Sequence, residues 1–181
     1  MNKDEIEFTK TWWSAVCKDS ARFVKWMQKL QITEIGGYTD HVDFLKSGIG
    51  YDERSAKILM NIAEDEMKHS NILTGLMNYR GIELVEPTIE TCSSYWTYMN
   101  QQYDDLKTYA AVNHFGESLA AERFEIILDH PDTDVDVRYA LKIILPDEVF
   151  HRETLQRMAG EAALAKMEAH HDLAFGRLIG K

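Results

Sequence analysis

The sequence Asp-Glu-Met-Lys-His at residues 65–69 returns as Asp-Glu-Val-Phe-His at residues 147–151. Residues three positions apart share one face of an α-helix, so the Glu and the His of each motif can point at one atom. A carboxylate oxygen beside an imidazole nitrogen suits iron, manganese or zinc. Because chance gives Asp-Glu-x-x-His well under once in this composition, its recurrence predicts two halves of one metal site.

Glu34 and Glu117 each lie in an apolar helical stripe, where a carboxylate without a partner is expensive. Antiparallel helices joined by a tight turn bring residues equidistant from the turn to the same level. Glu34 and Glu66 are nearly equidistant from the turn at residues 48–50. Glu117 and Glu148 are likewise nearly equidistant from the break at residues 130–133. The predicted metal ligands are therefore Glu34, Glu66, His69, Glu117, Glu148 and His151.

The composition is that of an ordinary globular protein of 181 residues, 45% hydrophobic and 28% charged. A formal net charge of −10 argues against nucleic-acid binding and against an anionic membrane surface. Cys17 and Cys92 form no Cys-x-x-Cys pair, and neither a signal-like start nor a run of about 18 apolar residues is present. We expect a single domain over residues 1–181, cytoplasmic, with no nucleic-acid and no membrane partner.

Apolar residues recur at steps of three and four, and breakers are few, with 3 Pro and 10 Gly, which is typical of an all-α fold. The expected helices cover residues 4–17, 19–47, 52–80, a stretch after 92 that ends near 128, 134–158 and 160–178. The expected architecture is a four-helix bundle over residues 19–158, with an extra N-terminal helix in 1–18 and a C-terminal helix in 159–181. Pro146 should kink the fourth bundle helix one turn before its ligands.

A crossover must join the second and third bundle helices, because these helices run parallel if each hairpin supplies half of the site. Residues 82–92 are not expected to be helical, since they contain Pro87 and several β-branched residues. From Glu66 to Gly81 a helix descends about 22 Å, and the extended segment 82–92 spans at most about 36 Å, which is short for the return. Part of residues 93–103 should therefore belong to the crossover or bend away from the main helix.

Four glutamates and two neutral histidines carry a formal charge of −4, which two divalent cations balance. We expect the glutamate of each Glu-x-x-His motif to bridge the ions and each histidine to bind one ion. Glu34 and Glu117 should each bind one ion or shift between modes. Asp65 and Asp147 can reach across to hold the imidazole N–H of the other motif; a solvated helix face is the alternative. Without metal the buried carboxylates would repel one another, so metal should stabilise the fold.

Three further features lie close to these ligands in the sequence. Tyr38, one turn after Glu34, could line a pocket beside the metals, with ordinary core packing as the alternative. His114, one turn before Glu117, is predicted to be an outer partner of the site or a core histidine, with a seventh metal ligand as the other reading. Gly36-Gly37 weakens its helix by about 1 kcal/mol per Gly, which a closely packed neighbour or a π-bulge near the metal would explain.

The pattern of Glu34, Glu66-x-x-His69, Glu117 and Glu148-x-x-His151 resembles the ferritin-like di-iron carboxylate superfamily over residues 19–158. That superfamily includes bacterioferritins, rubrerythrins, ribonucleotide reductase small subunits, aldehyde-deformylating oxygenases and bacterial multicomponent monooxygenases. The resemblance implies two iron ions, which manganese or zinc can replace, and a reaction with O₂ at the reduced centre.

Two functions follow from the resemblance. The first is an O₂-dependent di-iron oxidase or oxygenase acting on a small organic substrate, supplied by an electron donor that the sequence does not identify, in a monomer or homodimer. The extra terminal helices and the long separation between Glu66 and Glu117 favour it. The second is a ferroxidase and iron-storage protein, favoured by the chain length and by acidic charge that attracts Fe²⁺. A metal-stabilised binding protein without turnover is the third reading.

Overall fold

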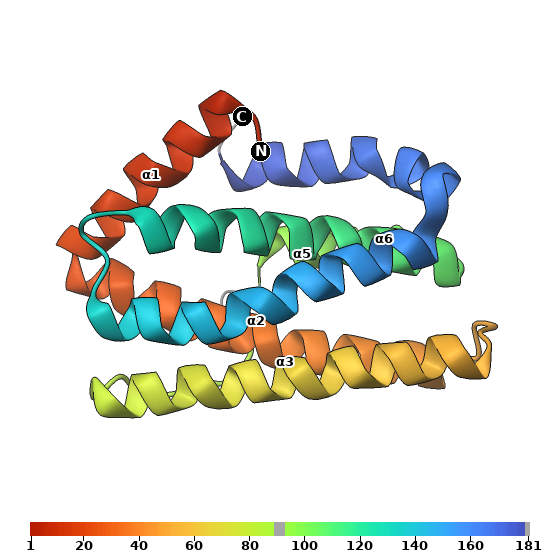
Figure 1. The fold of residues 1–181 in the computed structure, drawn as a ribbon, viewed down its shortest axis with the longest axis horizontal. Helices are drawn as coiled ribbons and strands as arrows, with labels where there is room; N and C mark the ends of the chain where they lie inside the picture. The colour runs from red at the N-terminus through yellow and green to blue at the C-terminus, as the bar shows by residue number, and fades with distance from the viewer. Residues whose placement is uncertain (89–92, 180–181) are drawn as a thin grey trace.

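The computed structural model describes residues 1–88 and 93–179, and within these residues it contains helices and no strand (Figure 1). The helices are α1 (Lys3–Lys18), α2 (Ser20–Lys46), α3 (Glu53–Tyr79), α4 (Ser94–Met99), α5 (Leu106–Asp129) and α6 (Val135–Leu178). The all-α prediction is confirmed. No described helix combines the length and the apolar character needed to cross a membrane.

Aspartate side chains cap the starts of α2, α3 and α5. The Asp19 carboxylate accepts hydrogen bonds from two backbone N–H groups at the start of α2. Asp52 accepts from the Ser55 N–H at 2.7 Å and begins α3. Asp105 forms a capping box with Thr108 and begins α5. These side chains satisfy N–H groups that have no partner within the helix, so each start agrees with local sequence chemistry.

The crossover between α3 and α5 is longer than residues 82–92 alone. Residues 82–88 are non-helical, as predicted, and residues 89–92, with Cys92, lie outside the described residues. The short helix α4 then packs against α6, and α5 begins only at Leu106. Residues 93–105 therefore belong to the connection between α3 and α5 and not to α5 itself, as expected from the span.

α6 is kinked at Gly160, whose φ of 72° and ψ of 165° are not helical. The kink divides α6 into the two helices that the sequence predicted. Pro146 lies within the first of these helices. The residue with non-helical φ and ψ is Gly160, which comes after the Glu148–His151 motif, whereas the kink expected from Pro146 would come before it. Glycine permits the positive φ because it has no Cβ. After Gly160 the chain folds back along α5 toward α1 (Figure 1).

Two apolar clusters lie on either side of the predicted ligands along the bundle. One contains Trp13, Met27, Leu73, Phe124 and Ile144. The other contains Phe44, Leu59, Tyr109, Leu155 and Met167. On each of the four bundle helices, the predicted ligands come between a member of the first cluster and a member of the second. Burial of these side chains provides the main favourable free energy for folding, so the bundle is held together above and below its polar middle.

α4 is seated on α5 through one close contact. A Cβ at Gly116 would overlap the indole ring of Trp96, so α5 must have glycine there for α4 to pack. Gly116 directly precedes Glu117, and the packing of the crossover is thereby linked to the position of a predicted ligand.

The contact predicts opposite effects of alanine at two helical glycines. Gly116→Ala should lower the free energy of unfolding by about 1–3 kcal/mol, because the new methyl group displaces Trp96. Gly75→Ala on the exposed side of α3, where a Cβ meets nothing within 4 Å, should raise it by up to about 1 kcal/mol. Urea denaturation followed by circular dichroism measures both. Equal stability of the two variants would show that Trp96 does not pack on Gly116.

Candidate metal centre

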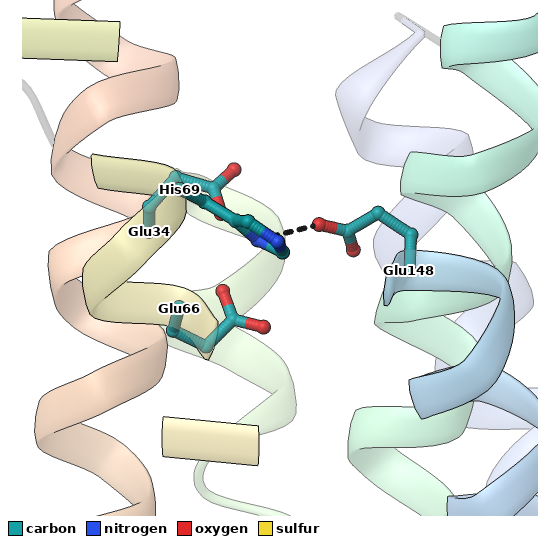
Figure 2. A group of neighbouring side chains, drawn as sticks. All are labelled: Glu34, Glu66, His69 and Glu148. Atoms are coloured by element: carbon teal, nitrogen blue, oxygen red, sulfur yellow. Dashed lines mark hydrogen bonds and ion pairs between the residues drawn. The ribbon is translucent and has the colours of Figure 1, made fainter. Parts of the chain in front are cut away.

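All six predicted ligands are buried at the middle of the bundle, each at most 7% exposed. They form two groups of four, and within each group the candidate ligand atoms lie within 4.8 Å of one another. The groups are Glu34, Glu66, His69, Glu148 and Glu66, Glu117, Glu148, His151. Figure 2 shows the first group, with Glu148 of α6 facing three side chains from α2 and α3. Glu66 and Glu148 belong to both groups, so they are placed as bridging carboxylates would be.

His69 is oriented by carboxylates on both of its ring nitrogens. Its Nδ1 lies 3.2 Å from Glu34 Oε2 and 3.1 Å from Glu148 Oε1. Its Nε2 lies 3.2 Å from Asp147 Oδ2, across the contact between α3 and α6. If Nε2 carries the proton and donates to Asp147, the lone pair of Nδ1 faces the carboxylate cluster.

His151 repeats this arrangement from the other side. Its Nδ1 lies 3.2 Å from Glu66 Oε1, and its Nε2 lies 3.4 Å from Asp65 Oδ2. Each aspartate thus reaches the imidazole of the opposite motif, as the sequence analysis anticipated. The reason is helical geometry, because a residue next to the inward-facing glutamate is turned by about 100° toward the neighbouring helix.

Three buried atoms of the cluster lie close to other ligand atoms but form no hydrogen bond of acceptable geometry among the described residues. They are Glu66 Oε1, Glu148 Oε1 and His151 Nδ1. A buried polar atom without a partner costs about 1–3 kcal/mol. All three are electron-pair donors that face the same region, so a cation is the kind of group that would satisfy them together. The residues present therefore fit a metal ion.

The electrostatics of the metal-free cluster also indicate that positive charge is needed there. Burial, followed by the charges of neighbouring glutamates, raises the pKa of Glu66 and of Glu117 well above the ordinary value. Burial also raises the pKa of Glu148 to about 7. For His69, burial opposes the charged form, but Glu148 and Glu34 raise its pKa to about 11. Without a metal, protons take the place of the missing positive charge.

Gly37 explains how α2 comes so near to the cluster. A Cβ at this position would lie 3.0 Å from Glu66 Cγ and Oε2, whereas a Cβ at Gly36 would meet nothing within 4 Å. α2 is α-helical throughout, so a close neighbour and not a π-bulge accounts for the glycine at 37. A side chain there would push Glu66 away from its place.

The other candidates from the sequence are not members of the two groups. Tyr38 is half-buried one turn after Glu34 on α2. His114 belongs to neither group, and its Nδ1 lies 2.9 Å from the backbone carbonyl oxygen of Arg152, to which it donates. The third Glu-x-x-His match, at residues 168–171, is also separate, since His171 Nδ1 pairs with the hydroxyl of Tyr95 at 2.8 Å.

Two contacts near the site were not predicted from the sequence. The Tyr109 hydroxyl donates to His41 Nδ1 at 2.7 Å, and both side chains are buried. Burial lowers the pKa of His41 to about 3, so its ring is neutral and can accept. Lys68 Nζ donates to Asp147 Oδ2 at 2.6 Å. His41 and Tyr109 lie in the apolar stripes of their helices, but nothing in the sequence indicates that they are in contact. From the sequence alone, Lys68 is expected to be an ordinary solvated lysine.

The raised pKa of Glu66 predicts a pH-dependent penalty in the metal-free protein. The penalty is absent below 4.5, the ordinary pKa, and grows as the pH rises toward the folded-state pKa. Metal-free Glu66→Gln should therefore be more stable than the parent by at least about 1 kcal/mol near pH 8. The difference should shrink near pH 5. Denaturation at both pH values in chelator tests this, and a difference that does not vary with pH would contradict the raised pKa.

A second prediction uses the neighbouring glycines as a matched pair. Gly37→Ala should weaken Co²⁺ binding by at least about 10-fold, because it displaces Glu66, a loss of the size seen when the support of a metal ligand is removed. Gly36→Ala, one residue away with free space, should leave binding unchanged. Calorimetric titration measures both. Equal affinities would mean that Glu66 does not need the space left by Gly37.

No family model, no curated protein and no solved structure was found to match the chain. The structure itself supports a helical bundle that holds a buried cluster of glutamates and histidines, and this cluster could bind metal ions.

Proposed function

We propose that this chain is a dinuclear metal protein of the ferritin-like kind. Glu66 and Glu148 would be shared by two ions, while Glu34 and His69 would complete one position. Glu117 and His151 would complete the other. The observation that carries the proposal is the overlap of the two groups in two glutamates, each with a buried oxygen that makes no hydrogen bond. A single ion would leave one histidine and one terminal glutamate without a role.

The connectivity supports the ferritin-like architecture. α2 and α3 form one hairpin, and α5 forms another with the first half of α6. Each hairpin supplies one terminal glutamate and one Glu-x-x-His motif. The segment that contains α4 joins α3 to α5, and it takes the place of the crossover that such a bundle requires.

The donor set favours iron. It consists of carboxylate oxygens and imidazole nitrogens with no thiolate, which suits iron or manganese, and zinc is the third candidate. Two ferrous ions in this site would supply electrons to O₂. The protein's part is to hold the ions, to keep each imidazole oriented through Asp65 or Asp147, and to exclude water by burial.

We further propose that the chain oxidises a small organic substrate with O₂, using electrons from a separate donor. α4 and the second half of α6 pack outside the part of the bundle that carries the candidate ligands, and these additional helices favour catalysis. Tyr38, half-buried next to Glu34, is the proposed contact for the substrate side of the centre. Iron storage is the second candidate, because a formal net charge of −10 attracts Fe²⁺.

Anaerobic loading with Fe²⁺ tests the site. The wild-type chain should bind two ions per chain, and exposure to O₂ should then give an absorbance change from ferric iron. Glu66→Ala and His151→Ala should each lose two-ion binding, because each removes a ligand that no neighbour replaces. Glu125→Ala on the exposed side of α5 is the control and should bind two ions. Two ions in both site variants would refute the ligand assignment.

Size distinguishes the two candidate functions. A monomer or dimer on gel filtration, with no more than two iron ions per chain after repeated Fe²⁺ and O₂ additions, supports catalysis. A large cage that accumulates many iron ions per chain would replace the oxygenase proposal with storage.

A further inference from the structure

Lys68 is a cation beside both outer aspartates of the proposed centre. Its Nζ donates to Asp147 Oδ2 at 2.6 Å and lies 3.6 Å from Asp65 Oδ1. Asp147 Oδ2 is also the atom 3.2 Å from His69 Nε2. The side chain of Lys68 is 51% exposed, and no other ion pair of either aspartate with a lysine or arginine is found in the part of the chain that the structure describes.

The second motif has no such cation. Phe150 occupies the position that corresponds to Lys68, between the glutamate and the histidine of residues 147–151. It is 57% exposed and cannot donate a hydrogen bond to Asp65. The two halves of the centre therefore have the same ligand types but different charge around their outer aspartates.

The difference acts on His69 more than on His151. Asp147 accepts from both Lys68 and His69 through one oxygen, so the ammonium draws charge from the carboxylate that orients His69. Asp65 accepts no hydrogen bond from Lys68, since 3.6 Å exceeds the usual range. A carboxylate on the outer nitrogen strengthens an imidazole as a metal ligand. The strengthening is therefore reduced on the His69 side.

We infer that Lys68 makes the two metal positions unequal, so that the position of Glu34 and His69 binds a dication more weakly than that of Glu117 and His151. This inference rests on the proposed function. It makes Lys68 a positioning residue that acts through Asp147, and it predicts that the centre fills in order, the His151 side first.

Anaerobic titration with Co²⁺, followed by absorbance and calorimetry, tests the inference without turnover. Wild-type protein should show two steps whose affinities differ by at least about 10-fold, the usual effect of an outer hydrogen-bond partner. Lys68→Met should tighten the weaker step by about 10-fold and bring the steps together. Lys68→Arg keeps the cation and the donor and should retain the separation.

Two further variants isolate the position of the charge. Lys57 lies on the exposed side of the same helix, three turns away from Lys68. Lys57→Met changes the net charge by the same amount and should leave both binding steps unchanged. Phe150→Lys adds the missing cation beside Asp65 and should weaken the tighter step. Thermal melts of the metal-free variants show that each one is folded.

The outcomes separate the inference from the proposed function. Two ions bound with equal affinity in wild type, or unequal steps that persist in Lys68→Met, would overturn the inference while leaving the dinuclear site in place. An equal effect of Lys57→Met would also overturn it, since general charge would then be the cause. Failure of wild type to bind two Co²⁺ ions would instead overturn the proposed function itself.

Discussion

Four carboxylates buried at one level of a helical bundle repel one another and lose their hydration. The rest of the structure must compensate for this unfavourable free energy. Each buried charge without compensation costs several kcal/mol. In the metal-free protein the compensation comes from protons, because Glu66, Glu117 and Glu148 all have raised pKa values. The two histidines alone cannot supply it, since the pKa of one is raised and that of the other is lowered. A pair of dications removes the need for the protons.

The two hairpins meet this constraint in the same way. Each hairpin contributes a histidine, one glutamate that belongs to a single group and one that belongs to both groups. Each also contributes an aspartate that lies beside the imidazole of the other hairpin. An imidazole held on its outer nitrogen keeps its inner lone pair aimed at the cluster. These two aspartate–histidine contacts also join α3 to α6 at the level of the site. The ligand set and the packing of the bundle therefore depend on the same contacts.

The positions of the ligands were predictable because helices and tight turns leave little freedom. A spacing of three places Glu66 beside His69, and equal distances from the turns bring Glu34 and Glu117 to the same level. The direction of the chain after Gly160 and the place of Trp96 depend on packing between distant segments. Lys68 was beyond prediction for the same reason, since its partner Asp147 is 79 residues away and on another helix.

The two apolar clusters make a preformed site physically reasonable. They lie above and below the polar middle, and they bury enough large side chains to hold four helices in register without a metal. Small zinc domains differ, since they have no such core and fold only around the ion. Here the free energy of metal binding need not be used to order the chain. If the cluster binds metal as proposed, that free energy can displace protons from the carboxylates, so that metal uptake would be tied to proton release more than to folding.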